Sequence, residues 1–367
     1  MKKLVIGIIA LIMVAAIIGI SLIGFALFPA DREKAKIGVI GPLSGDVASL
    51  FEGVKNGALL ALKDSGADIE FVFEDGKCSG RDAITAAKKL IEIDRVEAIL
   101  GGLCSGETLA IAPVADSEEV ALVSAGSTNP TISGISEYVF RTIPHDAVQG
   151  KTLAEAVYNL KYRKPAIIFI NNDYGSALKD VIANRLGELN IEALAVEAFE
   201  QDAMDFRTQL LKIQSKNPDS LIIVSLAKEP PIILKQAKEL GMELQFFGPE
   251  TFADNDVIQN SGNAINGTIF TYPHVSTTSI AQDFREKYKK EYGRDTDAYA
   301  AEAYDAATIL INAIKAGNTT GPQIKNYLNS INLEGASGTI QFDPNGDVQK
   351  EYDLYIIEDG AYKPYPQ

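Results

Sequence analysis

The sequence of 367 residues has no tryptophan, only two cysteines and only two histidines. Cys78, Cys104, His145 and His274 are spaced too widely for a common zinc motif, and they offer little to a catalytic thiol. The hydrolase pattern G-x-S-x-G and the zinc-peptidase pattern H-E-x-x-H are both absent. The glycine-rich segment 101–106 does not match the dinucleotide-binding pattern G-x-G-x-x-G. We therefore expect no metal, no cofactor and no enzymatic activity.

Positive charge is also scarce, with 34 Lys and Arg against 49 Asp and Glu and a net charge of −15. No basic cluster stands out beyond the N-terminus, whereas proteins that bind nucleic acids carry a basic patch or stripe. We expect no nucleic-acid partner. The acidic excess suits an exported protein that has to stay soluble.

The chain has a single long apolar run, residues 4–28, which follows Lys2 and Lys3. At about 1.5 Å per residue this run is long enough to cross a hydrocarbon core of about 30 Å. We expect residues 1–34 to anchor the protein in the membrane, with the lysines inside and the body outside, at the cell surface or in the periplasm. The small residues of Gly24-Phe25-Ala26 leave a cleaved signal peptide as the alternative.

Both cysteines lie in the part of the chain that we expect to be exported. Two thiols in an oxidising compartment predict one disulfide, between Cys78 and Cys104. The chain-entropy model assigns such a cross-link roughly 3–4 kcal/mol of stability.

From residue 36 onward, short apolar strands alternate with amphipathic helices. The first series has strands at 37–40, 69–75, 96–100 and 120–124, and helices at 47–64, 82–93 and 107–117. A second series has strands at 166–170, 193–198, 221–226 and 267–273, and helices at 176–188, 205–215 and 231–240. Such alternation predicts parallel sheets covered by helices on both faces.

The C-terminal part adds helices at 279–292, 298–316 and 321–330 and a last strand at 353–357. Residues 343–347, DPNGD, begin like a calcium loop but lack its sixth-position glycine and closing glutamate, so we expect a plain turn. The predicted fold is α/β: two doubly wound parallel-sheet lobes joined by a hinge of several crossovers and preceded by one hydrophobic helix. The predicted limits are 36–143 plus 274–348 for lobe 1, and 144–273 plus 349–367 for lobe 2.

Two turns of the first lobe favour binding of a small anion. In the stretch 101–130, one glycine-rich turn precedes a helix expected to begin near Glu107, and a second turn follows the next strand. Ser105, Ser127 and Thr128 supply hydroxyl groups, and the start of the helix supplies N–H groups and the positive end of a dipole. We therefore predict a carboxylate site.

Two residues of the second lobe follow buried strands, at the sheet edge where ligands of parallel sheets bind. Tyr174 lies in the segment NNDYG (171–175), and we expect it to form a wall over an apolar ligand side chain. Glu250 lies in GPETF (248–252), and opposite a carboxylate site it is a partner for a ligand ammonium.

With these motifs in view, the chain resembles the leucine/isoleucine/valine-binding protein family, the type I periplasmic solute receptors of branched-chain amino acid ABC transporters. The resemblance covers essentially all of residues 36–358. It rests on the segments GPLSG (41–45), LCSGET (103–108), SAGSTNP (124–130), VFRTIPHDAVQG (139–150), NDYG (172–175), ILKQAKELG (233–241), FFGPE (246–250) and AYDAA (303–307).

The resemblance implies a role for several residues. Ser105 matches a serine that binds the ligand carboxylate. Gly126 and Thr128 match a pair that contacts the ligand amine and carboxylate. Tyr174 matches an aromatic residue that closes over the ligand, and Glu250 matches the acid that receives the amine. Tyr299 matches an aromatic residue of the side-chain pocket, and Cys78–Cys104 matches the disulfide of the family.

The chain departs from the leucine receptors at two positions. Leu226 stands where they commonly have a tyrosine, and either Leu50 or Phe51 stands at the position of the aromatic residue that follows their first turn. We expect a receptor that closes over a small aliphatic amino acid and delivers it to the membrane subunits of an ABC permease. A membrane-tethered sensory domain is the alternative role. An amide, urea or an aromatic acid is the alternative ligand.

Overall fold

The computed structural model describes residues 34–45 and 47–366. The predicted anchor or signal peptide, residues 1–34, lies almost wholly outside this range. None of the helices in the described ranges has the length and apolar character of a membrane span.

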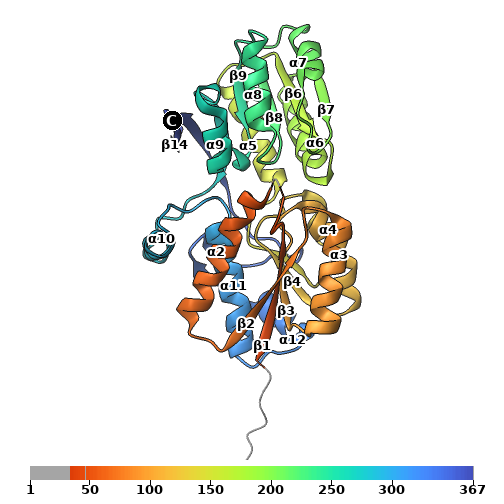
Figure 1. Ribbon diagram of the computed structural model, residues 1–367, viewed down its shortest axis with the longest axis vertical. Helices are drawn as coiled ribbons and strands as arrows, with labels where there is room; N and C mark the ends of the chain where they lie inside the picture. The colour runs from red at the N-terminus through yellow and green to blue at the C-terminus, as the bar shows by residue number, and fades with distance from the viewer. Residues whose placement is uncertain (1–33, 46, 367) are drawn as a thin grey trace, which may run out of the picture. The chain divides into compact units, whose positions relative to one another are not determined.

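The first sheet is parallel throughout, with the strand order β2-β1-β3-β4-β5. Every residue of β3 and β4 is buried, because helices cover both faces of the sheet. Helices α2 and α11 lie side by side on one face, and α3 and α4 lie together on the other (Figure 1). The elements are β1 Ala35–Gly41, α2 Ala48–Ser65, β2 Ile69–Asp75, α3 Gly80–Lys88, a π-helical turn Lys89–Asp94, β3 Ala98–Gly101, α4 Ser105–Ser117, β4 Ala121–Ser124, a 3₁₀ turn Pro130–Ile132 and β5 Val139–Arg141.

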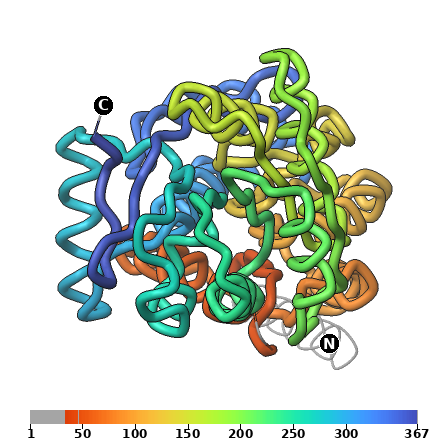
Figure 2. Tube along the Cα trace, turned by 90° about the horizontal axis from the view of Figure 1, so that it is seen from above, coloured from red at the N-terminus to blue at the C-terminus, as the bar shows by residue number. Residues whose placement is uncertain are grey.

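The second sheet has the order β14-β13-β10-β9-β8-β6-β7. Strands β6 to β10 are parallel to one another. Strand β13 pairs antiparallel with β10, and β14 pairs antiparallel with β13. The C-terminal strands, dark blue in Figure 2, therefore lie beside β10, which is about 80 residues earlier in the chain. The elements are α5 Asp146–Asn159, β6 Pro165–Ile170, α6 Asp173–Glu188, β7 Val196–Phe199, α7 Arg207–Gln214, β8 Ser220–Val224, α8 Pro230–Glu239, β9 Gln245–Gly248, a 3₁₀ turn Glu250–Ala253, α9 Asn255–Ser261, a 3₁₀ turn Gly262–Ala264, β10 Ile269–Pro273, β13 Tyr352–Glu358 and β14 Ala361–Pro364.

The C-terminal helices return to the first sheet. Helices α10 and α11 pack on α2, and α12 packs on β4. The chain thus passes between the two sheets three times, after β5, after β10 and before β13. We call the elements around the first sheet lobe 1 and those around the second lobe 2. The added elements are α10 Ser279–Tyr292, α11 Ala300–Lys315, α12 Gly321–Ser330, β11 Leu333–Gly335 and β12 Gly338–Ile340.

The predicted α/β fold with two doubly wound lobes is confirmed, while the residue limits of the lobes stay a prediction. The helix predicted to begin near Glu107 begins at Ser105, and the strand predicted at 193–198 is Val196–Phe199. Helices α5 and α9 and strand β14 were not predicted. Helix α5 is hidden in the sequence because its first turns, DAVQG, combine polar residues with Gly150, which packs against Val181 of α6.

Candidate ligand-binding site

A cavity with an empty volume of about 300 Å³ lies between residues of the two lobes. It is lined by Leu50, Leu103, Cys104, Ser105, Gly126, Tyr174, Leu226, Glu250, Thr251 and Tyr299. Five of the predicted ligand-binding residues, Ser105, Gly126, Tyr174, Glu250 and Tyr299, are thus brought together. Ser127 and Thr128 are buried beside this group but do not line the cavity.

The first turn of lobe 1 leads from β3 into α4. Gly101 ends β3 with a φ of +149°, and a Cβ there would lie 2.3 Å from the carbonyl oxygen of Ile40. Only glycine tolerates this close approach, which turns the chain toward Ser105, the first residue of α4. The N–H groups of Ser105 and Gly106 belong to the first helical turn, where N–H groups have no partner within the helix. Of these two residues, Ser105 lines the cavity.

The side chain of Glu107 binds N–H groups just before the start of α4, a contact that was not predicted. Its carboxylate is buried and accepts hydrogen bonds of 3.0 Å each from the N–H groups of Cys78, Leu103 and Cys104. Burial raises the pKa of Glu107 to about 7, although these N–H donors oppose the shift. Part of the positive end of α4 is thus taken up by a side chain of the helix itself. The predicted disulfide between Cys78 and Cys104 is confirmed beside it, with the two Cα atoms 5.3 Å apart.

The second turn is tied to the first by hydroxyl groups. Ser124 donates to the carbonyl oxygen of Gly102 at 2.7 Å, and Ser127 lies 3.0 Å from the same oxygen and 2.7 Å from the Thr108 hydroxyl. The Ser127 side chain therefore holds the two turns together within lobe 1. Its predicted contact with the ligand, and that of Thr128, stay predictions.

Lobe 2 contributes residues that follow the carboxyl ends of its strands. Tyr174 is the second residue of α6, which follows β6, while Leu226 follows β8 and Glu250 follows β9. The hydroxyl of Tyr174 is buried and has no hydrogen-bond partner in the described chain. Ligands of open parallel sheets bind at this edge, so the positions agree with the general rule.

The carboxylate of Glu250 is held from both lobes. One oxygen accepts a hydrogen bond from the hydroxyl of Tyr299 at 3.0 Å, and the other accepts one from the amide of Gln149 in α5. The side chain is buried, and burial raises the pKa of Glu250 against the effect of these donors. Tyr299, which precedes α11 of lobe 1, thus reaches across the cavity to lobe 2.

Asp146, the first residue of α5, is a second acidic group that sequence reasoning missed. It is fully buried, and neither carboxylate oxygen has a hydrogen-bond partner among the described residues. Burial and the neighbouring charge of Glu250 raise the pKa of Asp146 well above its ordinary value, and the nearby Thr128 hydroxyl offsets part of this shift. The Gln149 side-chain oxygen also lacks a partner. Asp146 and Gln149 do not line the cavity, and the charge of Arg141 also offsets part of the rise in the pKa of Asp146.

The wall of the cavity is apolar. Leu50 of α2, Leu103 and Leu226 face it, and of the two positions weighed in the sequence only Leu50 does so, because Phe51 packs on Gly41. An adjoining cavity of about 210 Å³ shares Leu50, Glu250 and Tyr299 and adds Ala253, Asp254, Asp297 and Ala298. Among the described residues that line the two cavities, none is Lys, Arg or His.

Some of the missed residues carried a weak signal in the sequence. Asp146 and Gln149 lie in the segment 139–150 that supports the family resemblance, at the start of the unpredicted helix α5. Asp297 accepts the N–H groups of Tyr299 and Ala300 at 2.9 Å, and burial raises its pKa to about 6. A solvated acid and a buried one look the same in a sequence, so only the three-dimensional contacts identify them.

Comparisons with known proteins agree with this geometry. The sequence model of a family described as “Periplasmic binding protein” matches residues 34–361. The leucine-, isoleucine-, valine-, threonine- and alanine-binding protein of Pseudomonas aeruginosa is 25% identical over 350 residues, which are 91% of this chain and 92% of that protein.

Two solved structures share the fold. A leucine-binding protein from Thermotoga maritima is 30% identical with a TM-score of 0.86, covering 90% of this chain and 98% of that chain. A solute-binding protein of an ABC transporter from R. palustris, in complex with benzoate, is 18% identical with a TM-score of 0.84, covering 90% of this chain and 95% of that chain. The second likeness concerns the fold alone.

Proposed function

The chain belongs to the periplasmic binding protein family, and on that premise we propose that it is an extracytoplasmic solute-binding receptor of an ABC importer for a small aliphatic amino acid. Its fold is the type I periplasmic binding protein fold that the sequence resemblance implied. The proposed activity is binding and release by two lobes, without a chemical step.

The observation that carries the proposal is the buried carboxylate of Glu250 in a cavity whose described lining residues include no basic side chain. The neighbouring Asp146 does not line the cavity, and the charge of Arg141 offsets part of the rise in its pKa. Burying carboxylates without a partner is costly, so a ligand that brings its own positive charge binds favourably. An α-ammonium has three N–H donors, and the Glu250 carboxylate that lines the cavity is an acceptor for them.

The opposite end of the cavity suits a carboxylate. Ser105 offers its hydroxyl, and the first turn of α4 offers N–H groups and the positive end of the helix dipole. Acceptors in lobe 2 and donors in lobe 1 together form a site for a zwitterion, which is the head group of an amino acid.

The apolar wall favours an aliphatic side chain. Leu50, Leu103 and Leu226 line the cavity. Leu226 leaves more room than a tyrosine would, so the wall accepts a branched side chain. An aromatic acid such as benzoate has no ammonium and would leave Glu250 without a counter-charge, which disfavours that ligand class.

The partners follow from the proposed role. The related Pseudomonas aeruginosa protein is named for the amino acids that it binds, and the family that the sequence resembles serves ABC transporters. We assign the same kind of partner to this chain: the membrane subunits of an ABC permease, outside the cytoplasm.

Titration calorimetry with folded protein tests the proposal. The ligands are the aliphatic and polar amino acids, benzoate, urea and a short amide. We expect binding of one or more of leucine, isoleucine, valine and alanine and none of benzoate. Binding of benzoate or urea with no response to any amino acid would overturn it.

A further inference from the structure

Besides Tyr299, a second side chain of lobe 1, that of Asn129, donates a hydrogen bond to lobe 2. The amide nitrogen of Asn129, in the second turn of lobe 1, donates a hydrogen bond of 2.7 Å to the carbonyl oxygen of Asp173, the first residue of α6 in lobe 2. Asn129 is buried. Any movement of the lobes away from each other has to break this bond.

The orientation of the Asn129 amide is set within lobe 1. Its side-chain oxygen accepts from both the N–H and the hydroxyl of Thr131 at 2.8 Å. The oxygen is therefore held inside the turn, and the NH₂ group is aimed at lobe 2. Such preorganisation lowers the entropy lost when the bond across the cleft forms.

The backbone of Asn129 connects this bridge to the ligand site. Its N–H donates to the hydroxyl of Ser105 at 3.2 Å, and Ser105 lines the cavity. Its carbonyl oxygen accepts from the guanidinium of Arg141 at 2.8 Å. The residue that bridges the lobes is thus bonded to a proposed ligand contact on one side and to Arg141 on the other.

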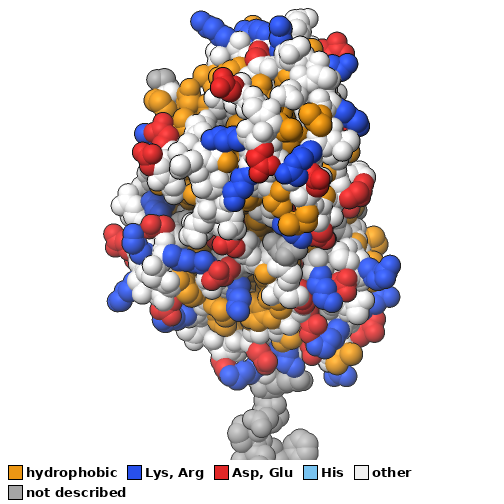
Figure 3. Space-filling model, turned by 45° about the horizontal axis from the view of Figure 1, so that its top comes forward, with side chains coloured by type: hydrophobic (Ala, Val, Ile, Leu, Met, Phe, Trp, Pro, Cys, Tyr) orange, Lys and Arg blue, Asp and Glu red, His pale blue; other side chains and the backbone are white. Residues whose placement is uncertain are grey.

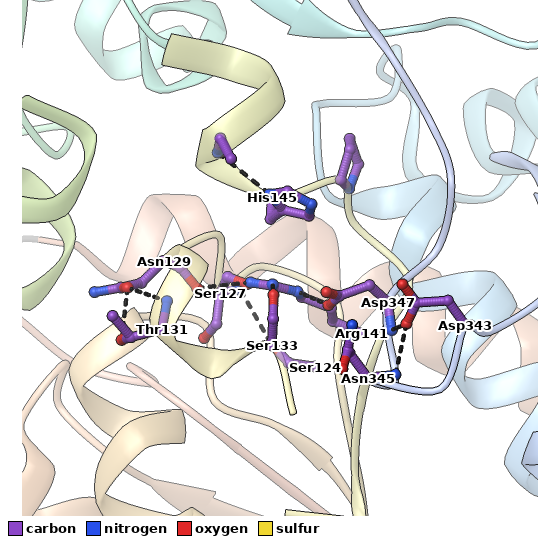
Figure 4. A network of polar contacts seen from close by, with 12 residues as sticks. Ser124, Ser127, Asn129, Thr131, Ser133, Arg141, His145, Asp343, Asn345 and Asp347 are labelled. Atoms are coloured by element: carbon purple, nitrogen blue, oxygen red, sulfur yellow. Dashed lines mark hydrogen bonds and ion pairs between the residues drawn. The ribbon is translucent and has the colours of Figure 1, made fainter. Parts of the chain in front are cut away.

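Arg141 is fully buried at the end of β5, where the chain leaves lobe 1 for the first time. Its guanidinium pairs with Asp347 and donates to the hydroxyl of Ser133 and to the carbonyl oxygen of Ser127 (Figure 4). Asp347 closes the DPNGD turn, in which Asp343 accepts the N–H groups of Asn345 and Asp347. This turn, for which the sequence indicated no role, anchors Arg141 close to the third crossover.

A close approach of two helix starts accompanies the bridge. A Cβ at Gly106, in the first turn of α4, would lie 2.8 Å from a carboxylate oxygen of Asp173. The missing side chain at Gly106 lets the start of α6 come near enough for the bond to Asn129.

From these contacts we infer that Asn129 is a latch that holds the lobes closed over the ligand, and that Arg141, held by Asp347, is a positioning residue for this latch. The inference rests on the proposed function for the identity of the ligand but not for the latch itself. Because the bond exists only with the lobes together, its loss speeds opening and leaves ligand entry to the open form unchanged.

Stopped-flow dissociation of L-leucine, or of the amino acid that binds most tightly, measures the latch. We expect Asn129→Ala to raise the dissociation rate constant about fivefold, with little change in the association rate constant or the melting temperature without ligand. Asn171→Ala is the matched control, since Asn171 lines the same surface groove but bonds Glu200 within lobe 2. An unchanged dissociation rate constant in Asn129→Ala would overturn the inference.

The role of Arg141 is tested by coupling to Asn129. Arg141→Lys keeps a charge for Asp347 but loses the donor to the Asn129 carbonyl. We expect faster ligand dissociation in Arg141→Lys, and no further increase when Asn129→Ala is added, because both changes act on one contact. If the effects of the two substitutions on the dissociation rate constant were additive, Arg141 would not be a positioning residue for the latch. The Asn129→Ala result decides the latch even if Arg141→Lys does not fold.

A distance measurement separates the latch from the identity of the ligand. Spin labels are attached at Glu118→Cys in lobe 1 and Lys216→Cys in lobe 2, which are both exposed positions. Double electron–electron resonance then measures the distance between the labels, which increases when the lobes open. We expect Asn129→Ala to lower the population with the closed-form distance, with and without L-leucine. Equal distributions in both conditions contradict the latch, whereas a wild-type protein that ignores L-leucine contradicts only the proposed ligand.

Discussion

Glu250 is the residue on which ligand recognition depends most. It sits in a buried environment that disfavours its charge, held by Gln149 and Tyr299 and close to Asp146. A buried carboxylate stays ionised more readily when a cation is near. The bound ligand ammonium is therefore expected to lower the pKa of Glu250.

The substitution Glu250→Gln tests this electrostatic role. We expect the affinity for an aliphatic amino acid to fall at least about 30-fold, because the ammonium loses its buried counter-charge. Calorimetry with leucine and with 4-methylpentanoate, which lacks the amine, measures the effect. Glu229→Gln is the control, since Glu229 is equally buried in lobe 2 but bonds Ser225 and the N–H of Asp202. Equal losses for both compounds would refute the role.

Glu107 links ionisation to stability. Its pKa is about 7 in the folded protein and ordinarily 4.5, so between these values the folded chain holds a proton that the unfolded chain has lost. The free energy of unfolding therefore decreases as the pH rises through this window, by up to about 3 kcal/mol from this group.

Urea unfolding of wild type and Glu107→Gln at pH 5 and pH 8 checks the contribution of Glu107. Glu302, whose pKa is raised to about 7 by burial against the effect of Lys350, adds to the slope of both proteins. The difference between the two proteins isolates Glu107, and we expect a smaller loss at pH 8 in the variant. Identical losses would show that Glu107 is ionised in the folded protein at both pH values.

At the scale of elements, the packing of α2 on α11 depends on a missing side chain. A Cβ at Gly57 would lie 2.1 Å from the carbonyl oxygen of Ala300 at the start of α11. Helices come this close only where glycine leaves room for the neighbouring backbone. The sequence shows Gly57 inside a predicted helix but gives no hint of which segment it faces.

Two glycine substitutions compare packing with helix propensity. We expect Gly57→Ala to lower the free energy of unfolding by about 2 kcal/mol, because the two helices have to separate. Gly187→Ala, at an exposed site of α6 with no atom within 4 Å of the new Cβ, is expected to raise it by about 0.5 kcal/mol. Urea denaturation measures both. A Gly57→Ala protein as stable as Gly187→Ala would contradict the close approach.

Most strands and helices could be predicted from the sequence because each carries its own apolar pattern. Buried strands such as β3, β4 and β8 are continuous apolar runs between glycine or polar turns. Helix α5 could not be predicted in this way, since His145 caps it and Gly150 interrupts its pattern. Strand β14 is four residues of mixed polarity that pair only with β13, so its partner determines it.

The residues of the candidate site likewise fall into those that a local sequence pattern predicts and those that it does not. Ser105, Tyr174 and Glu250 follow strands or begin helices, and their positions could be predicted from local order. Asp146, the bridge from Asn129 to Asp173, and the pair of Arg141 with Asp347 join segments far apart in the sequence. No local pattern contains such contacts.

At the scale of the whole molecule, the face shown in Figure 3 carries Lys and Arg interspersed with Asp and Glu. The crossovers between the lobes are tied together inside, where Lys350 donates to the carbonyl oxygen of Thr142 at 2.8 Å and to Glu302 at 2.6 Å. Glu250, by contrast, lines a cavity whose described lining residues include no Lys, Arg or His.

The central claim is that the two lobes recognise both charges of an amino acid. The most direct test is a calorimetric titration of leucine, 4-methylpentanoate and 3-methylbutylamine, which share an aliphatic tail and carry both charges, the carboxylate alone and the ammonium alone. The account predicts that leucine binds and that each analogue binds at least about 30-fold more weakly. Binding of 4-methylpentanoate as tight as that of leucine would contradict the account.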